Sequence, residues 1–307
     1  MFDNPELKNL SRYVRSYLGG LRTLCVEVDG QEWKYLEGGK GETILFLHGG
    51  LGSKTQWRSL MREYLTQYRV IAVDVPGLCV NQTFHAKKHS FRQLGIWLSK
   101  VIEQLRLGRV HLMGSSLGAA IAAYYAANHP DQVESLTLLG FPDQLFSKGS
   151  SAGEVIREIF DASCIQTTDD LQFYYQRVFY QLPTVPKIVL RYNLREFLKY
   201  RDVFRTVVAE LVEAGPVLMA SLRKIRMPTL VLHGECDQVF QSGGAEFWEL
   251  QIPHAQFHLL AECGHMIHIE KPDEVVKFHR KLLRIARYSA TASEQQEEET
   301  GRFSVLE

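Results

Sequence analysis

The stretch Gly114-Ser115-Ser116-Leu117-Gly118 lies between an apolar run at residues 110–113 and a run of small residues at 119–123. It predicts a sharp turn from a buried strand into a helix, with Ser116 at the turn. Glycines two positions before and after the serine fit this prediction, because a strained turn leaves no room for side chains there. We therefore expect the hydroxyl of Ser116 to point out of the sheet as a nucleophile, beside helix NH groups that face a developing oxyanion.

Two polar residues further along the chain are candidate partners of this serine. Asp237 follows an apolar strand at 229–232, and His265 follows one at 257–260. Both lie just beyond the ends of predicted strands, where side chains from neighbouring loops converge over a sheet. The order serine, acid, histidine is the order of one known type of catalytic triad. Asp143, which follows the preceding predicted strand, is the rival candidate for the acid.

Strand and helix signals alternate along the first half of the chain, after a hairpin at 22–35. This alternation predicts a sheet covered by helices on both sides. The expected strands are 44–47, 70–75, 110–113 and 135–139, and the expected helices are 55–67, 90–105 and 117–128.

From residue 141 to 226 helical periodicity with many aromatic residues replaces the alternation, which predicts a helical cap inserted into the core. The predicted core is thus discontinuous, formed by residues 1–140 and 227–288. The acidic tail at 289–307 has too little apolar surface to fold alone, so we expect it to be disordered.

Four motifs in register make the chain resemble the α/β-hydrolase superfamily over about residues 25–287. They are His48-Gly49-Gly50, Asp74-Val75-Pro76-Gly77, the Ser116 turn, and the loops that carry Asp237 and His265. The resemblance implies an α/β-hydrolase fold, with a mostly parallel central sheet flanked by helices and a helical cap. It also implies a triad of Ser116, Asp237 and His265, and an oxyanion hole formed by the backbone NH groups of Gly50 and Leu117.

The chain departs from this family after Pro76-Gly77. The family commonly continues with Gly-x-Ser, whereas here Leu78-Cys79-Val80-Asn81 follows. The conformation of this loop and its contribution to the site are therefore left open.

The chain is most similar in pattern to carboxylesterases, ring-cleavage-product hydrolases and lipases of the monoacylglycerol type. This resemblance implies hydrolysis of a carboxylic ester with a small or medium acyl chain, an acylglycerol included. Three alternatives stay open, namely a carbon-carbon bond hydrolase, a peptidase on the same triad, and a slow-turnover receptor. Serine at 116 disfavours dehalogenase and epoxide hydrolase chemistry, where the family has aspartate, and Leu51 stands where the related peptidase motif has proline.

Charge and histidine placement limit the partners and cofactors. The 35 basic and 35 acidic residues balance, so no overall field attracts nucleic acid, and we expect no nucleic-acid partner. No cofactor is expected. No metal is expected either, because the histidines near the motifs lack neighbouring carboxylates or thiols at ligand spacing. These histidines are His48, His233, His265 and His268.

The ends of the chain and its cysteines bear on location. Five cysteines without regular spacing, and a start without a basic and apolar leader, predict a reducing, cytoplasmic protein. No apolar run reaches about 18 residues, so no membrane span is expected. The helix predicted at 5–18 has one apolar face, which fits either packing on the protein or peripheral contact with a membrane. The acidic tail also resembles export signals of injected bacterial effectors, and the sequence does not decide the oligomeric state.

Overall fold

The computed structural model describes residues 19–79, 90–143 and 165–303, with side chains described as far as residue 289. The predicted helix at 5–18 lies outside the described residues. So do the first part of the predicted cap, 144–164, and the continuation of the Pro76-Gly77 loop from Val80 onward.

The centre of the molecule is an eight-stranded sheet in the order β1-β2-β4-β3-β5-β6-β7-β8. The hairpin of β1 and β2 pairs antiparallel with β4, and all other neighbouring strands are parallel. Every strand expected from the sequence is present. The bounds are β1 (Leu21–Val28), β2 (Gln31–Gly38), β3 (Thr43–Leu47), β4 (Arg69–Val73), β5 (Val110–Ser115), β6 (Val133–Leu139), β7 (Thr229–Gly234) and β8 (Gln256–Leu260).

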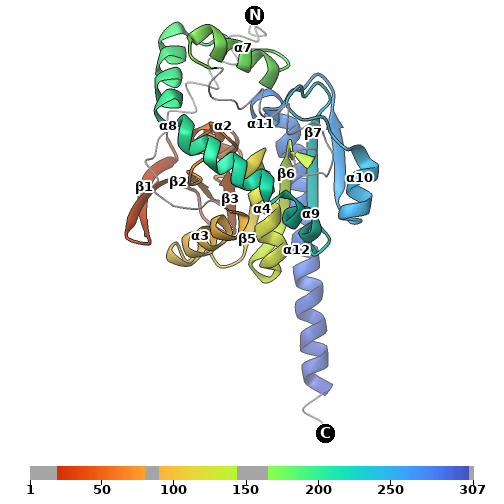
Figure 1. Ribbon diagram of the computed structural model, residues 1–307. Coiled ribbons are helices and arrows are strands. Elements are labelled where there is room, and N and C mark those ends of the chain that lie inside the picture. Colours follow the sequence, from red (N-terminus) through yellow and green to blue (C-terminus); the bar gives the residue numbers. More distant parts are fainter. Residues whose placement is uncertain (1–18, 80–89, 144–164, 304–307) are drawn as a thin grey trace, which may run out of the picture.

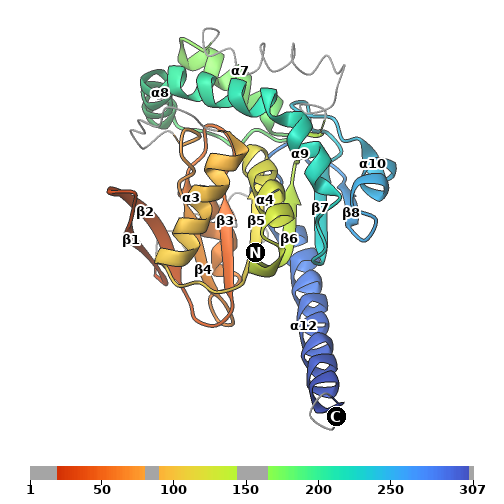
Figure 2. The same ribbon diagram turned by 60° about the horizontal axis from the view of Figure 1, so that its bottom comes forward.

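Helices cover both faces of the sheet. Successive strand residues point to opposite faces, and in the central strands both sets of side chains are apolar and must be buried. In β3, Leu45 and Leu47 join the apolar cluster on one face, and Ile44 and Phe46 join the cluster on the other. Helices α3 (Phe91–Gln104) and α4 (Leu117–Asn128) pack on the first face, as Figure 2 shows; α2 (Arg58–Arg62), α11 (Ile267–Glu270) and α12 (Pro272–Phe303) pack on the second. The predicted fold class, a mostly parallel sheet between helices, is confirmed.

The first helix after β3 is shorter than expected. Instead of one helix at 55–67, a 3-10 turn η1 (Lys54–Trp57) leads into α2 (Arg58–Arg62). At the start of this segment, the backbone NH of Lys54 donates to Asp74 Oδ1 at 2.7 Å, and the Lys54 ammonium group binds the other carboxylate oxygen. This anchor fixes the backbone of the first turn to the end of β4.

Three helices, α7 (Thr168–Val178), α8 (Lys187–Glu213) and α9 (Gly215–Leu222), follow β6, and we call them the cap helices. Helices α7 and α8 lie across the end of the sheet where the parallel strands finish (Figure 1). Carboxyl ends of parallel strands are the usual ligand sites of such sheets. The cap helices therefore lie over the region where the predicted site residues gather.

Helix α12 continues through residues 289–303, which were expected to be disordered. The segment is rich in alanine, glutamate and glutamine, which favour helix, and it extends a packed helix without the cost of a new nucleus. In Figure 1 this part of α12 projects beyond the sheet. No helix in the described parts of the chain is both long and apolar enough to cross a bilayer. The remaining described helices are η2 (Pro130–Gln132) and α10 (Gly244–Gln251).

Candidate active site

Ser116 lies at the turn between β5 and α4, as predicted. Its φ of 54° and ψ of −124° place it in a backbone region that residues with a side chain rarely adopt. A Cβ at Gly114 would lie 2.3 Å from the Gly118 carbonyl oxygen, and one at Gly118 would lie 2.4 Å from the His48 carbonyl oxygen. Both positions must therefore be glycine if the strained turn is to close. The Ser116 NH donates to the Leu139 carbonyl at 2.8 Å, which ties the turn to the end of β6.

Asp237 lies in the loop after β7 and is held on both carboxylate oxygens. Its Oδ1 accepts hydrogen bonds from the NH groups of Val239 at 2.8 Å and Phe240 at 3.0 Å. Its Oδ2 lies 2.7 Å from His265 Nδ1 and 3.3 Å from His233 Nε2. Backbone donors thus fix the carboxylate, while its other oxygen faces two imidazoles.

The charge of Asp237 is stabilised despite its burial. Burial by itself raises the pKa of this carboxyl, but the two imidazoles outweigh burial and hold the pKa of Asp237 well below its usual range. Burial also lowers the pKa of His233, yet the hydrogen bond and the charge of Asp237 raise the pKa of His233 above its ordinary value. Asp237 is therefore ionised at neutral pH, and its Oδ2 can accept a hydrogen bond from the His265 ring.

His265 lies beside the segment that holds the Ser116 turn. A Cβ built on Gly140 would lie 3.2 Å from both Cε1 and Nδ1 of His265. Gly140 directly follows Leu139, the residue that binds the Ser116 NH. Because Nδ1 donates to Asp237, the neutral ring leaves Nε2 as a proton acceptor.

The loop after β3 packs against the Ser116 turn. A Cβ at Gly49 would lie 2.8 Å from Ser116 Cβ, and one at Gly50 would lie 3.3 Å from Leu117 Cδ1. The first NH groups of α4 have no acceptor within the helix. The two residues predicted to form the oxyanion hole, Gly50 and Leu117, are thus neighbours at the nucleophile turn.

His48 fixes the shape of this loop. Its Nδ1 donates to the Gly49 carbonyl at 2.7 Å, and its Nε2 accepts from the Val75 NH at 2.9 Å. Burial lowers the pKa of His48, so the ring stays neutral and keeps both bonds. Together with the ion pair of Lys54 and Asp74, this histidine joins the loop after β3 to the end of β4.

A family profile described as "alpha/beta hydrolase fold" matches residues 42–272. The chain belongs to the α/β-hydrolase fold family. Over 257 residues it is 26% identical to human monoacylglycerol lipase ABHD6, covering 78% of this chain and 74% of that protein. It is 27% identical over 271 residues to Lipase 1 of Psychrobacter immobilis, covering 84% and 83%. The crystal structure of a membrane phospholipase A, a bacterial virulence factor, superposes with a TM-score of 0.79 at 28% identity, covering 92% of both chains.

This α/β-hydrolase is an enzyme of a serine hydrolase family, and the similar proteins named above are lipases. The family resemblance stated from the sequence is therefore confirmed.

One group of side chains in this hydrolase has the composition of a metal site. His48, Asp74 and Cys79 offer ligand atoms that all lie within 4.8 Å of one another. Both ring nitrogens of His48 already take part in hydrogen bonds, and the Asp74 carboxylate already binds Lys54. The group therefore holds the loop after β3 in place, and the backbone of Cys79 adds to this through an isolated parallel β-bridge with Gly52.

Asp143, the rival candidate for the acid, binds a different partner. Asp143 is buried, and its Oδ2 accepts from the Gly243 NH at 2.6 Å, whereas His265 pairs with Asp237.

Burial raises the pKa of the Cys263 thiol to about 12. Cys263 is therefore a poor nucleophile at neutral pH, although it lies two residues from His265.

The cap helices contribute aromatic side chains to the region over the nucleophile. A Cβ at Gly50 would lie 2.9 Å from the ring of Phe204, which belongs to α8. Tyr174 of α7 packs against the large apolar cluster, and burial first, then the charges of Tyr175 and Asp237, raise the pKa of its hydroxyl. The cap helices thus place the aromatic side chains of Phe204 and Tyr174 near the predicted site residues.

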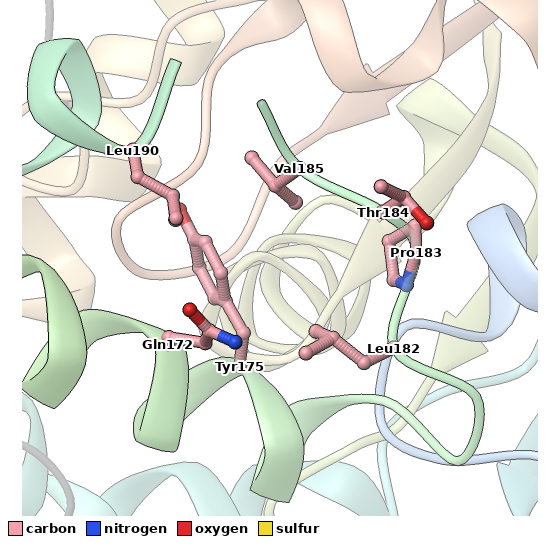
Figure 3. Close-up of a pocket in the computed structure, with 7 residues that line it drawn as sticks. All are labelled: Gln172, Tyr175, Leu182, Pro183, Thr184, Val185 and Leu190. Carbon is pink, nitrogen blue, oxygen red and sulfur yellow. The ribbon is translucent and has the colours of Figure 1, made fainter. Parts of the chain in front are cut away.

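A separate hollow of about 270 Å³ lies within the cap itself. In Figure 3, Tyr175 and Leu190 face Val185 and Pro183 across it. Gln172, Leu182 and Thr184 complete its lining, and none of the predicted triad residues belongs to it.

Sequence reasoning missed His233 as a neighbour of the site, since it considered this residue only as a metal ligand. Its Nε2 also contacts the Phe240 carbonyl at 2.8 Å, so it donates to that oxygen as well as facing Asp237. The spacing of four residues between His233 and Asp237, across the end of β7, was the available signal.

Proposed function

We propose that this hydrolase cleaves a carboxylic ester with a small or medium acyl chain, an acylglycerol among the candidate substrates, through an acyl-enzyme on Ser116. The observation that carries the proposal is the 2.7 Å hydrogen bond between His265 Nδ1 and Asp237 Oδ2 beside the strained Ser116 turn. The names of the similar lipases support an ester or lipid substrate.

In the proposed reaction, His265 Nε2 takes the proton of the Ser116 hydroxyl as its oxygen attacks the ester carbonyl. The backbone NH groups of Gly50 and Leu117 donate to the oxyanion that forms. The ester bond then breaks, and the alcohol leaves with the proton held by His265. A water molecule, deprotonated by the same histidine, attacks the acyl carbon. The bond from that carbon to the Ser116 oxygen breaks as His265 returns the proton to this oxygen, and the acid is released. Asp237 keeps His265 in the required tautomer throughout.

We propose that residues 141–226 act as the cap of the substrate pocket, inserted between core segments 1–140 and 227–288. The position of Phe204 against Gly50 supports this role, because an acyl chain bound to the acyl-enzyme would meet that ring. An aromatic and apolar wall favours a hydrocarbon chain over a charged substrate.

A panel of p-nitrophenyl esters graded by acyl length, assayed beside monoacylglycerols, tests the proposal. We expect many turnovers per enzyme on at least one ester, and labelling by a fluorophosphonate that maps to Ser116. Labelling without turnover would favour the receptor alternative. Turnover of peptides or of ring-cleavage products, with no ester hydrolysed, would overturn the ester assignment.

A further inference from the structure

The end of cap helix α7 is bonded to the backbone of His265. The last carbonyl groups of a helix have no partner within it. Here the carbonyl of Val178, the final residue of α7, accepts a hydrogen bond from the His265 NH at 2.8 Å. The proposed catalytic base and the cap therefore share a direct backbone contact.

Glu270, at the end of α11, adds three hydrogen bonds to the same junction. Its Oε1 accepts from the NH groups of Tyr180 at 2.8 Å and Gln181 at 3.0 Å, just beyond the end of α7. Its Oε2 accepts from the Gly264 NH at 2.8 Å, next to His265. One carboxylate thus holds the backbone of two segments that lie more than eighty residues apart in sequence.

The junction is closely packed as well as bonded. A Cβ built on Gly264 would lie 2.6 Å from the Tyr180 nitrogen, 2.9 Å from the Phe179 carbonyl carbon and 2.9 Å from Glu270 Oε2. Any side chain at 264 would push the cap segment away from the histidine loop. Glycine at this position keeps the backbone of the two segments in contact.

We propose that Glu270 is a positioning residue that makes the cap and the His265 loop a single unit, so that neither segment moves without the other. The proposal rests on the proposed function for the role of His265, but the junction itself does not involve substrate. Charged acceptors form stronger hydrogen bonds than neutral ones, and three NH groups on one carboxylate satisfy donors of both segments. Loss of the carboxylate would free the segments together.

Hydrogen–deuterium exchange of the intact protein tests this coupling without an assay of activity. The variants are Glu270→Gln and Glu270→Ala, and Glu274→Gln is the control because its carboxylate pairs only locally with Lys277. A glutamine keeps one acceptor oxygen but presents an NH₂ group to the other set of NH donors. We expect exchange in peptides covering 178–181 and 262–266 to accelerate together, by about tenfold or more, in both Glu270 variants and not in the control.

Kinetics supply the second readout. Because His265 loses its fixed position, we expect kcat to fall about tenfold or more for both short and long esters in the Glu270 variants. A purely stabilising role would lower the melting temperature and leave kcat unchanged. Gly264→Ala breaks the same junction by sterics, so it should accelerate exchange in the same two peptides.

Acceleration confined to one of the two peptides in Glu270→Gln and Gly264→Ala would overturn the coupling. Should Glu270→Ala fail to fold, those two variants decide the matter. If the wild-type protein hydrolyses no ester but the two peptides still respond together, the proposed function fails and the coupling stands. If esters are hydrolysed and the peptides respond separately, the reverse holds.

Discussion

The sheet and the cap helices bury their apolar side chains to very different extents. Strand residues such as Leu45 and Phe46 are fully buried, each within a large cluster on its face of the sheet. The cap has a small cluster of its own, made of Ile165, Leu171, Leu190 and Phe197. Large apolar side chains nearby stay in water, with Phe173 62% exposed and Ile188 75% exposed.

This difference separates two tasks. The proposed catalytic groups lie on loops that begin at sheet strands, where dense packing restricts motion. The cap helices carry Phe204, the aromatic side chain that we propose meets the acyl chain. We therefore expect substitutions of the residues that follow the carboxyl ends of the strands to affect all substrates alike. Substitutions in the cap should affect substrates selectively.

The largest effect is expected from Ser116→Ala, at the carboxyl end of β5. Loss of the nucleophile of such a triad lowers kcat by about a million-fold, so ester hydrolysis should become undetectable for every acyl length. Steady-state assays on the ester panel measure this, with Ser99→Ala as the control because its hydroxyl only contacts Tyr125 on α4. Unchanged hydrolysis by Ser116→Ala would refute the assignment.

The next effect separates the two candidate acids. Asp237→Asn cannot hold His265 in the required tautomer, so kcat should fall about ten-thousand-fold. Asp143→Asn removes a carboxylate that binds the Gly243 NH, so it should change stability more than kcat. Paired measurements of kcat and melting temperature on the two variants check this. A crippled Asp143→Asn with an active Asp237→Asn would reverse the assignment.

Acid should destabilise the fold through buried histidines that lie outside the cap helices. Burial lowers the pKa of His111 to about 4 and that of His268 and His279 to about 3, whereas residues 165–226 contain no histidine. These rings stay neutral in the folded protein, while in the unfolded chain they take up protons below about pH 6.5. The stability that these three histidines contribute is therefore complete above pH 6.5 and declines as pH falls towards 4.

At pH 4.5, two units below the pKa of the unfolded chain, each of these histidines should lower the free energy of unfolding by about 3 kcal/mol. Urea denaturation at pH 7 and pH 4.5 measures the sum. His279→Gln should make the pH dependence shallower, since one proton-binding group is lost from the unfolded state. An unfolding free energy that does not change between the two pH values would contradict this prediction.

The smallest effect is expected in the cap, from Phe204→Ala. Loss of one buried aromatic side chain over Gly50 should lower kcat/KM for longer acyl chains by about tenfold, with little change for acetate esters. The same ester panel tests it, and Phe173→Ala, an exposed cap residue, is the control. An equal loss on all esters would group Phe204 with the residues at the carboxyl ends of the strands, and would contradict the expected difference between these residues and the cap.

The sequence predicted what depends on local pattern. The strands, the Ser116 turn and the position of Asp237 and His265 after their strands all follow from short motifs and hydrophobic periodicity. The hydrogen bond between Asp237 and His265 was reached through family resemblance, because residues 28 positions apart in sequence carry no local signal of contact.

What the sequence did not predict depends on contacts between distant segments. Glu270 looks like an ordinary surface acid until folding brings Tyr180 and Gln181 to it. The first turn after β3 is anchored where Lys54 reaches Asp74, a contact twenty residues away in sequence. Helix α12 extends past residue 289 because a packed helix precedes it, and composition alone does not register that support.

The left-handed backbone at Ser116 implies a trade-off between thermostability and turnover. Holding a residue with a side chain in this conformation costs about 1–3 kcal/mol, which glycine would not incur. Ser116→Gly should thus melt at a higher temperature than the wild-type protein while being inert. The side chain at this turn therefore lowers the stability of the fold, and a glycine there would restore it.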